Sequence, residues 1–290
     1  MRSEFMRSLE FTGMGIALCL LNAVACGAQE QAPTPERQVI YREVAGQALS
    51  IYAFFPAGHD SSKPADGILL LHGGGWSVGS PEWTFTTARR FAAWGLVALA
   101  VQYRLSDGNV TPIEALADVC AALAWARAHA GEIGLTHRIA GYGVSAGGHL
   151  IAATATVGCP DGEAGPDVLL LWSPALDVAG DGWFRQKLKG RAPVAAYSPV
   201  EHVGLSTPPT SIVQGAEDTV TPLAGARRYC ERLVSIGTVC DLHVYEGVGH
   251  LLTRNLAVQE RDFDPDPEAV AHGIERHRQF LVRLGFSPGK

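Results

Sequence analysis

The sequence predicts a single α/β domain built on a doubly wound, mostly parallel sheet with helices on both faces. Eight short runs are apolar and rich in β-branched or aromatic residues, as strands are. From residue 68 onward these runs alternate with helix-like segments, an order that specifies right-handed crossovers between parallel strands. The central runs are also continuously apolar, which is typical of parallel strands buried on both faces.

The expected strands differ in their patterning. The first two alternate more clearly between apolar and polar residues than the later ones do, which favours an antiparallel edge of the sheet. The eight runs lie at residues 39–44, 49–55, 67–72, 96–103, 138–145, 168–173, 210–215 and 240–245.

Four helices have recognisable first residues. Thr111, Pro112 and Glu114 supply an N-cap, a proline at the first helical position and a capping-box glutamate. This helix is expected to run to about Ala130. Three further helices are expected to open in the same way, at Ser80-Pro81, Thr221-Pro222 and Asp266-Pro267.

Residues 174–209 interrupt the alternation of strand and helix. They hold several prolines and glycines, show no strong periodicity and are too long for a plain connection. We expect this insertion to form a partial lid over one end of the sheet. Strands, helices and insertion use up the chain from residue 38 onward, so residues 29–290 are expected to form one domain.

Composition and charge exclude several classes of protein. Of the 290 residues, 47% are hydrophobic and 18% are charged, so the chain can bury a large core. The net charge is −6, and Lys and Arg do not gather into a run. A surface that binds a phosphate backbone is basic, so nucleic acid is not an expected partner.

The N-terminal segment predicts export. Residues 11–26 are uncharged, follow Arg2 and Arg7, and are too few for a membrane span of about 20 residues. We interpret residues 1–28 as a signal peptide, which leaves a periplasmic or secreted protein without a stable membrane span. A lipoprotein anchored through Cys26 and an uncleaved N-terminal anchor are the alternatives.

Export would place the remaining cysteines where disulfides persist. A Cys230–Cys240 bond would join a late helical residue to the start of a strand, a geometry that is sterically sound. Cys120–Cys159 is the other expected pair. Four buried free thiols are the alternative.

Ser145 is the candidate nucleophile. It is the centre of Gly143-Val144-Ser145-Ala146-Gly147, which lies where an apolar strand turns into a helix. Glycines two residues before and after the serine let strand and helix approach closely around a sharp turn that projects the hydroxyl. The N-terminus of the following helix offers positive potential to a developing oxyanion.

The run His72-Gly73-Gly74-Gly75-Trp76 follows the strand at residues 67–72 and exposes consecutive backbone N–H groups. The N–H groups of Gly74, Gly75 and Ala146 are the candidate oxyanion hole. His72 is expected to orient the loop and not to carry protons. A nucleotide-phosphate cradle is the competing interpretation, but the run lacks its glycine spacing and its lysine.

A serine nucleophile needs a base and an orienting acid, and candidates for both follow later strands. Asp218 comes after the strand at residues 210–215 and leads into the helix that opens at Thr221-Pro222. His250 comes after the strand at residues 240–245 and follows Gly249 in a loop that is able to reach the serine. Glu217 is the alternative acid.

These motifs together resemble the α/β-hydrolases, and within them the acetyl esterases and hormone-sensitive-lipase-like carboxylesterases. The resemblance rests on HGGGW, Tyr103-Arg104-Leu105, GYGVSAGGHL, QGAEDTVTP and YEGVGH, and covers nearly the whole mature chain. Short secreted bacterial esterases that deacylate polysaccharides, of the acetylxylan or feruloyl type, are the most similar. The long N-terminal cap of larger lipase-like members is missing, so an open acyl site is expected.

The resemblance implies a serine carboxylic-ester hydrolase that acts on short-chain acyl esters through an acyl-enzyme. Small-molecule esters and acetylated or feruloylated carbohydrates are the implied substrates, and no metal or organic cofactor is implied. Trp76 and Trp183 are expected to line the substrate groove. An arylformamidase or amidase with the same three residues, and a catalytically silent binding protein on this scaffold, are the alternatives.

Overall fold

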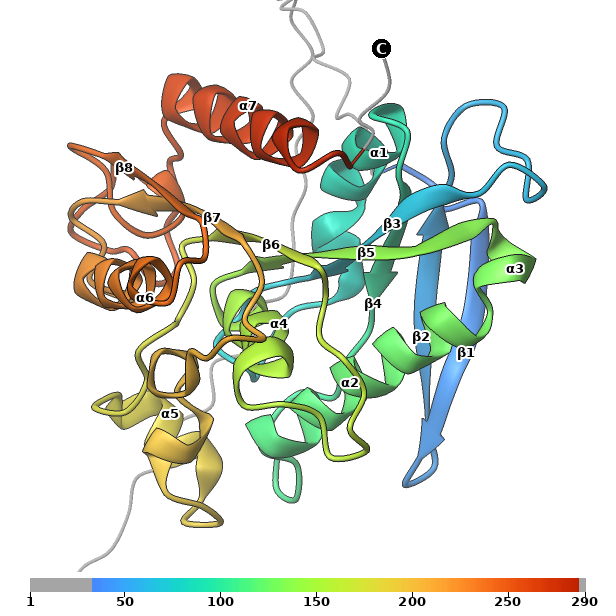
Figure 1. Ribbon diagram of the computed structural model, residues 1–290. Helices are drawn as coiled ribbons and strands as arrows, with labels where there is room; N and C mark the ends of the chain where they lie inside the picture. The colour runs from blue at the N-terminus through green and yellow to red at the C-terminus, as the bar shows by residue number, and fades with distance from the viewer. Residues whose placement is uncertain (1–32, 287–290) are drawn as a thin grey trace, which may run out of the picture. The chain divides into compact units, whose positions relative to one another are not determined.

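An eight-stranded sheet with the strand order β1-β2-β4-β3-β5-β6-β7-β8 runs through the computed structural model, which describes residues 33–286 (Figure 1). All eight expected strands are present. They are β1 Arg37–Val44, β2 Gln47–Phe54, β3 Ala65–Leu71, β4 Val97–Val101, β5 Leu135–Val144, β6 Val168–Trp172, β7 Thr210–Gly215 and β8 Cys240–Tyr245. The expected signal peptide, residues 1–28, lies outside the described residues.

The pairing of the strands follows the hydrophobic patterning. β1 pairs with β2 and β2 pairs with β4 in antiparallel fashion, whereas β4, β3 and β5 to β8 pair in parallel. Every residue of β4, β6 and β7 is buried, because helices cover both faces of this part of the sheet. The parallel order brings the carboxyl ends of β3, β5, β7 and β8 to one edge, where the loops that carry the candidate residues begin.

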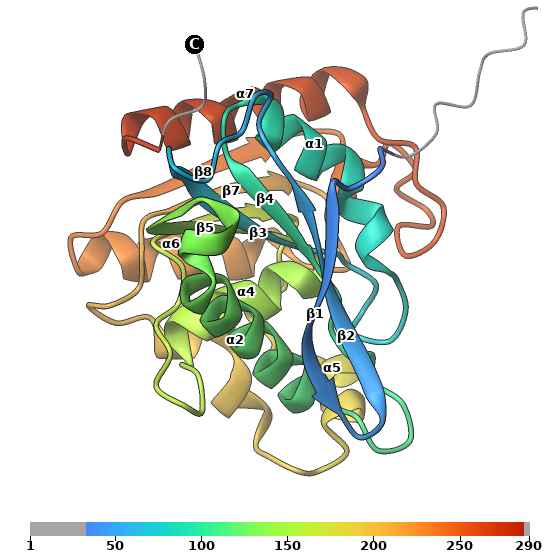
Figure 2. The ribbon, with the colours of Figure 1, turned by 90° about the vertical axis from the view of Figure 1, so that its right-hand side faces the viewer.

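Helices lie on both faces of the sheet, as expected. α1 and α7 cover one face, while α2, α4 and α6 cover the other (Figure 2). The helices are α1 Phe85–Ala93, α2 Pro112–Ala128, α3 Ala130–Ile133, α4 Ala146–Thr156, α5 Gly182–Leu188, α6 Leu223–Ser235 and α7 Pro267–Arg283, with short 3-10 turns η1 Pro81–Thr84, η2 Val194–Tyr197, η3 Pro199–His202 and η4 His250–Leu252.

Two of the four expected helix caps are present. Thr111 and Glu114 form the capping box of α2, and the Asp266 side chain accepts a hydrogen bond from the N–H of Ala269 at the start of α7. Ser80 precedes η1 without a capping bond from its side chain. The prediction that Thr221 caps α6 is wrong, because Pro222 occupies the cap position and the Thr221 hydroxyl turns back toward Asp218.

Both predicted disulfides are present. Cys230–Cys240 ties α6 to the start of β8, and Cys120–Cys159 ties α2 to the loop after α4. The Cα atoms are 5.3 Å and 5.7 Å apart, which are ordinary separations for disulfides. Such crosslinks stabilise the fold mainly by restricting the unfolded chain.

The insertion at residues 174–209 contains α5, η2 and η3 and packs against the elements that carry the candidate site. Phe184 of α5 is fully buried, with its ring 4.8 Å from Trp76 and 4.8 Å from His149. The insertion is therefore joined to the loop after β3 and to the first turns of α4.

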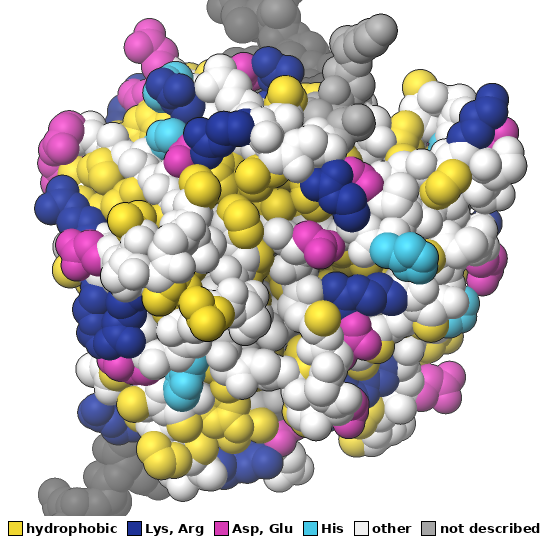
Figure 3. Space-filling view, viewed as in Figure 1, with side chains coloured by type: hydrophobic (Ala, Val, Ile, Leu, Met, Phe, Trp, Pro, Cys, Tyr) yellow, Lys and Arg dark blue, Asp and Glu magenta, His cyan; other side chains and the backbone are white. Residues whose placement is uncertain are grey.

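Charged side chains of both signs share the face of the molecule in Figure 3. On the face in Figure 3, Lys and Arg side chains alternate with Asp and Glu side chains. Of the helices in residues 33–286, none combines the length and apolar character that a membrane span needs.

Candidate active site

Ser145 occupies the sharp turn between β5 and α4. Its φ of 52° and ψ of −116° are a strained conformation for a residue with a side chain, and such strain collects at functional sites. Glycine is required at positions 143 and 147, because other backbone atoms lie too close to leave room for a Cβ. A Cβ on Gly147 would lie 2.3 Å from the carbonyl oxygen of His72, and one on Gly143 would lie 2.4 Å from that of Gly147.

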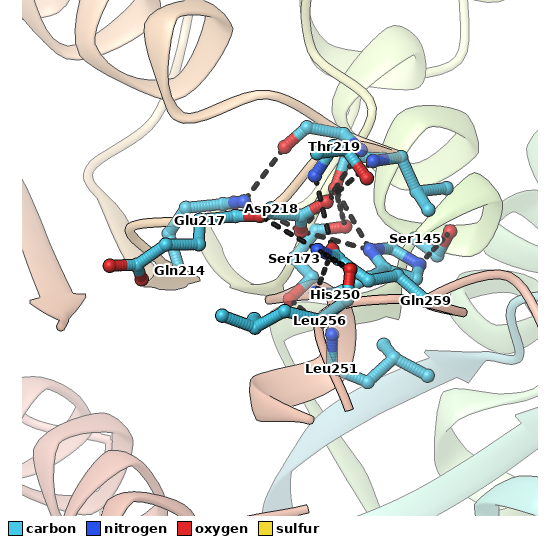
Figure 4. A network of polar contacts seen from close by, with 12 residues as sticks. Ser145, Ser173, Gln214, Glu217, Asp218, Thr219, His250, Leu251, Leu256 and Gln259 are labelled. Carbon is cyan, nitrogen blue, oxygen red and sulfur yellow. Dashed lines mark hydrogen bonds and ion pairs between the residues drawn. The ribbon is translucent and has the colours of Figure 1, made fainter. Parts of the chain in front are cut away.

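Ser145, Asp218 and His250 are brought together in one hydrogen-bonded chain (Figure 4). The Ser145 hydroxyl lies 3.0 Å from Nε2 of His250, and Nδ1 of His250 lies 2.9 Å from Oδ2 of Asp218. With Nδ1–H donating to the carboxylate, Nε2 is free to accept the serine proton. The exposed fractions of the three residues are 8%, 5% and 4%, so water screens these contacts little.

The Asp218 carboxylate is fully surrounded by donors. Oδ1 accepts the N–H groups of Val220 and Thr221 at 2.9 Å and 2.8 Å. Oδ2 lies 2.8 Å from Nε2 of Gln214 and 2.9 Å from the Thr221 hydroxyl, in addition to His250. Because both oxygens are engaged, the carboxylate is held in one orientation toward the imidazole.

Glu217, the alternative acid, is not part of this chain. Its backbone N–H donates to the carbonyl of Val248, and its side-chain Oε2 is buried with no hydrogen-bond partner in the described residues. The carboxylate next to His250 is that of Asp218.

Gln259 was not expected at the site, yet it joins the histidine loop to the acid loop. Its Oε1 accepts the N–H of His250 at 2.9 Å and the N–H of Thr219 at 3.1 Å. Its Nε2 donates to the carbonyl of Glu217 at 2.9 Å. No sequence motif marks this glutamine, since it sits in an irregular loop nine positions after the histidine.

The loop after β3, residues 72–76, is called the glycine loop below. It lies beside the sharp turn that carries Ser145. A Cβ on Gly73 would be 3.3 Å from Cβ of Ser145, so this loop and the serine are neighbours. Gly74 and Gly75 have φ angles of 110° and 56°, which favour glycine. In residues 33–286 the N–H groups of Gly74, Gly75 and Ala146 have no hydrogen-bond acceptor, and donors without a partner are what an oxyanion hole requires.

His72 holds this loop from inside. Its Nδ1–H donates to the carbonyl of Gly73 at 2.6 Å, and the Tyr103 hydroxyl donates to the His72 carbonyl at 2.8 Å. The two rings stack with their centroids 4.4 Å apart. His72 is 2% exposed, and its ring nitrogen bonds to Gly73 and not to the Ser145 hydroxyl.

The two tryptophans that were expected to line a groove have different environments. Trp183 is 50% exposed and its Nε1–H donates to the carbonyl of Gly75 at 3.1 Å, which places it over the glycine loop. Trp76 is only 3% exposed, so it cannot form the wall of an open groove. It is a packing residue, because a φ of 62° turns its ring inward against Phe184 and His149.

His149 is a second residue that sequence reasoning missed. It lies on α4 one turn after Ser145 and is fully buried. Its Nδ1 accepts the indole N–H of Trp76 at 3.2 Å, and its Nε2–H donates to the carbonyl of Tyr197 at 2.8 Å. It therefore joins α4 to both the glycine loop and the insertion.

A cavity of about 230 Å³ lies next to these residues. Thr221, whose hydroxyl contacts Asp218, forms part of its wall, as do Pro174 and Ala175 just after β6. The Ala175 N–H donates to the carbonyl of Ser145. A larger cavity of about 690 Å³ lies by β1, β2 and α1, and its lining includes Arg37, His59 and Arg89. The lining of neither cavity includes Ser145, Asp218 or His250.

No group of three or more His, Cys, Asp or Glu side chains in residues 33–286 is arranged to hold a metal ion.

Three buried histidines predict that the fold is sensitive to acid. Burial lowers the pKa of His72 and His149 to about 4 and that of His277 to about 3. These histidines take up protons near pH 6.5 in the unfolded chain but only near pH 4 or below in the folded one. The free energy of unfolding therefore has its full value above pH 6.5 and falls as the pH drops from 6.5 toward 4. At pH 5 the expected loss is about 2 kcal/mol for each histidine. Urea unfolding at pH 7.5 and pH 5 measures it.

His149→Gln is the matched variant for this prediction. Glutamine offers an acceptor to Trp76 and a donor to Tyr197 but does not titrate. Its unfolding free energy should therefore depend less steeply on pH between 6.5 and 5 than that of the natural protein. Equal unfolding free energies of the natural protein at pH 7.5 and pH 5 would contradict the prediction.

Comparison with known proteins agrees with this geometry. Residues 68–196 match a family model described as alpha/beta hydrolase fold. The structure of esterase 2 from Thermogutta terrifontis phosphoramylated by tabun is 30% identical, superposes with a TM-score of 0.77, and covers 88% of this chain and 96% of its own. The chain belongs to the α/β-hydrolase fold family.

Two further matches are also to proteins named as esterases. The propionate-bound structure of the same Thermogutta terrifontis esterase is 28% identical, with a TM-score of 0.79 and coverage of 90% and 98% of the two chains. Esterase LipC from Mycobacterium tuberculosis is 30% identical over 256 residues. That match covers 78% of this chain and 62% of LipC.

Proposed function

We propose that this α/β-hydrolase is a serine carboxylesterase that cleaves short-chain acyl esters. The observation that carries the proposal is the chain of hydrogen bonds from the Ser145 hydroxyl through His250 to Asp218. A serine, a histidine and a carboxylate in this order are the arrangement that activates a serine hydroxyl for acyl transfer. The named esterases among the relatives support the same reaction class.

Proton transfer is assigned to His250. Nε2 takes the proton of Ser145 as the serine oxygen attacks the ester carbonyl, and Asp218 stabilises the imidazolium that forms. The imidazolium then gives this proton to the alkoxide, which departs as the alcohol. The acyl group remains bonded to Ser145. Water attacks the acyl-enzyme with His250 again as the base, so the acid is released and the serine restored.

The oxyanion of each tetrahedral intermediate is assigned to the N–H groups of Gly74, Gly75 and Ala146. These donors are fixed by the backbone and have no other acceptor in the described residues. Donors of this kind act most strongly on the charge that develops in the transition state, where each is worth roughly 3 kcal/mol.

A short acyl group is proposed from the ligands named for a relative. Propionate and butyrate are named as bound in structures of the Thermogutta esterase. The half-exposed ring of Trp183 offers an apolar surface beside the glycine loop, on which a sugar or an aromatic alcohol part of an ester is able to stack.

We place this activity outside the cytoplasm and within a single domain of residues 29–290. Two disulfides in the described chain are the observation that supports export, because such bonds rarely persist in a reducing compartment. Mass spectrometry of the protein recovered from its native cells measures the new N-terminus. A chain that still begins at Met1 would contradict removal of residues 1–28.

A substrate panel tests the proposed reaction. We expect 4-nitrophenyl acetate and butyrate to be hydrolysed with kcat/KM at least tenfold higher than 4-nitrophenyl laurate, because the ligands named for the Thermogutta esterase, propionate and butyrate, are short acyl groups. Acetylated xylan, methyl ferulate and an arylformamide in the same panel separate carbohydrate ester, feruloyl ester and formamide substrates. Preference for the formamide over every ester would favour the arylformamidase alternative.

A further inference from the structure

Gln259 is a buried side chain whose hydrogen bonds all go to the two loops that carry the acid and the base. It is 3% exposed and comes from the irregular loop between η4 and α7. Oε1 accepts from the N–H of His250 and from the N–H of Thr219, the residue after Asp218. Nε2 donates to the carbonyls of Glu217 and Leu256.

All four hydrogen-bonding positions of the amide are therefore occupied. Figure 4 shows Gln259 in the same polar network as Asp218, Thr219 and His250. Gly249 makes room for it, since a Cβ at that position would lie 2.3 Å from Oε1 of Gln259. The neighbouring backbone needs such support, because the next two residues after His250, Leu251 and Leu252, have φ angles of 56° and 61°.

We propose that Gln259 is a positioning residue that fixes the distance between His250 and Asp218. The proposal rests on the function proposed above. Residues 217 and 219 flank the acid, and the N–H of residue 250 belongs to the base, so one amide group ties the backbones of both loops together. Gln259 itself makes no hydrogen bond to the Ser145 hydroxyl and acts only through the loops.

The kinetic consequence follows from the geometry. Loss of the amide lets the imidazole move relative to Asp218 on one side and Ser145 on the other. Displacements of about 1 Å in such groups lower rates by roughly 100-fold. The hydrogen bonds of Gln259 go to the acid loop and the histidine loop and not to the glycine loop or the Ser145 hydroxyl, so substrate binding should change little.

Gln259→Met tests the proposal, since methionine has a similar length but makes none of these four hydrogen bonds. Gln259→Glu keeps the oxygen that accepts from His250 and Thr219. Gln102→Met is the matched control, because the Gln102 side chain also accepts a backbone N–H, from Ser50 of β2 at 3.1 Å, but does not bond to the acid loop or the histidine loop. Each is assayed with 4-nitrophenyl acetate, with a fluorophosphonate and by thermal unfolding.

For Gln259→Met we expect kcat to fall about 10- to 100-fold, KM to stay within about twofold, and the rate of phosphonylation to fall in step with kcat. Gln259→Glu should recover part of kcat. Gln102→Met should keep kcat within about twofold even where its melting temperature falls as far as that of Gln259→Met.

Two results would overturn the proposal. One is a folded Gln259→Met variant with natural kcat and phosphonylation rate, which removes the positioning role while leaving the proposed function intact. The other is an equal fall of kcat in Gln102→Met, which would make the effect one of general stability. A natural protein that neither hydrolyses esters nor is phosphonylated would instead contradict the proposed function, and the positioning role with it.

Discussion

Replacing Ser145 by alanine should lower kcat for 4-nitrophenyl acetate by roughly 10⁴- to 10⁶-fold, to the background of the assay. The variant has no oxygen to attack the carbonyl, so the covalent route is closed and only weak stabilisation of the oxyanion remains. The change removes a single hydroxyl, which is hydrogen-bonded to Nε2 of His250. Alanine at φ 52° bears the same backbone strain as serine, so the fold should persist.

Circular dichroism and the melting temperature serve as the control for this variant. They should match those of the natural protein, which separates lost chemistry from lost structure. Retained hydrolysis in a folded Ser145→Ala protein would mean that another group is the nucleophile.

Asp218→Asn should lower kcat by about 10³- to 10⁴-fold. An amide cannot replace the carboxylate here, because donors face both oxygens. If the amide NH₂ occupies the Oδ1 position it meets the N–H groups of Val220 and Thr221, and in the Oδ2 position it meets Gln214 and His250. Either orientation leaves donors facing donors, so we also expect a loss of about 1–3 kcal/mol in the free energy of unfolding.

Glu217→Gln is the matched variant for this second prediction. It makes the same chemical change one residue earlier, at a side chain that has no bond to His250. Its kcat should stay within about twofold of the natural value. A large fall in Glu217→Gln together with an active Asp218→Asn would reverse the assignment of the acid.

The strands and the sharp turn at Ser145 could be predicted from the sequence, because residues close together in the chain determine them. Apolar β-branched runs identified all eight strands, and the uniform burial of β4, β6 and β7 corresponds to their unbroken apolar sequences. Gly143 and Gly147 could be recognised because a strand, a sharp turn and a helix are adjacent in sequence. The proximity of Asp218, His250 and Ser145 could be predicted because the carboxyl ends of parallel strands meet at one edge.

Contacts that depend on tertiary packing could not be predicted in this way. Trp76 has the sequence context of a groove residue, yet one positive φ angle turns its ring into the core. Thr221 has the pattern of a helix cap, but Pro222 holds the cap position of α6 and the Thr221 hydroxyl donates to Oδ2 of Asp218. His149 bonds to the Trp76 indole and the Tyr197 carbonyl, and Gln259 bonds to backbone groups of the acid and histidine loops, and such contacts leave no recognisable spacing in the sequence.

The mass of the protein after treatment with a fluorophosphonate tests the nucleophile most directly. We predict one phosphonyl adduct per chain, located by peptide mapping on Ser145, with loss of esterase activity in proportion to labelling. Ser145→Ala should carry no adduct. Full esterase activity in protein that carries the adduct on Ser145, or an adduct on any other residue that accompanies inactivation, would contradict the assignment of Ser145.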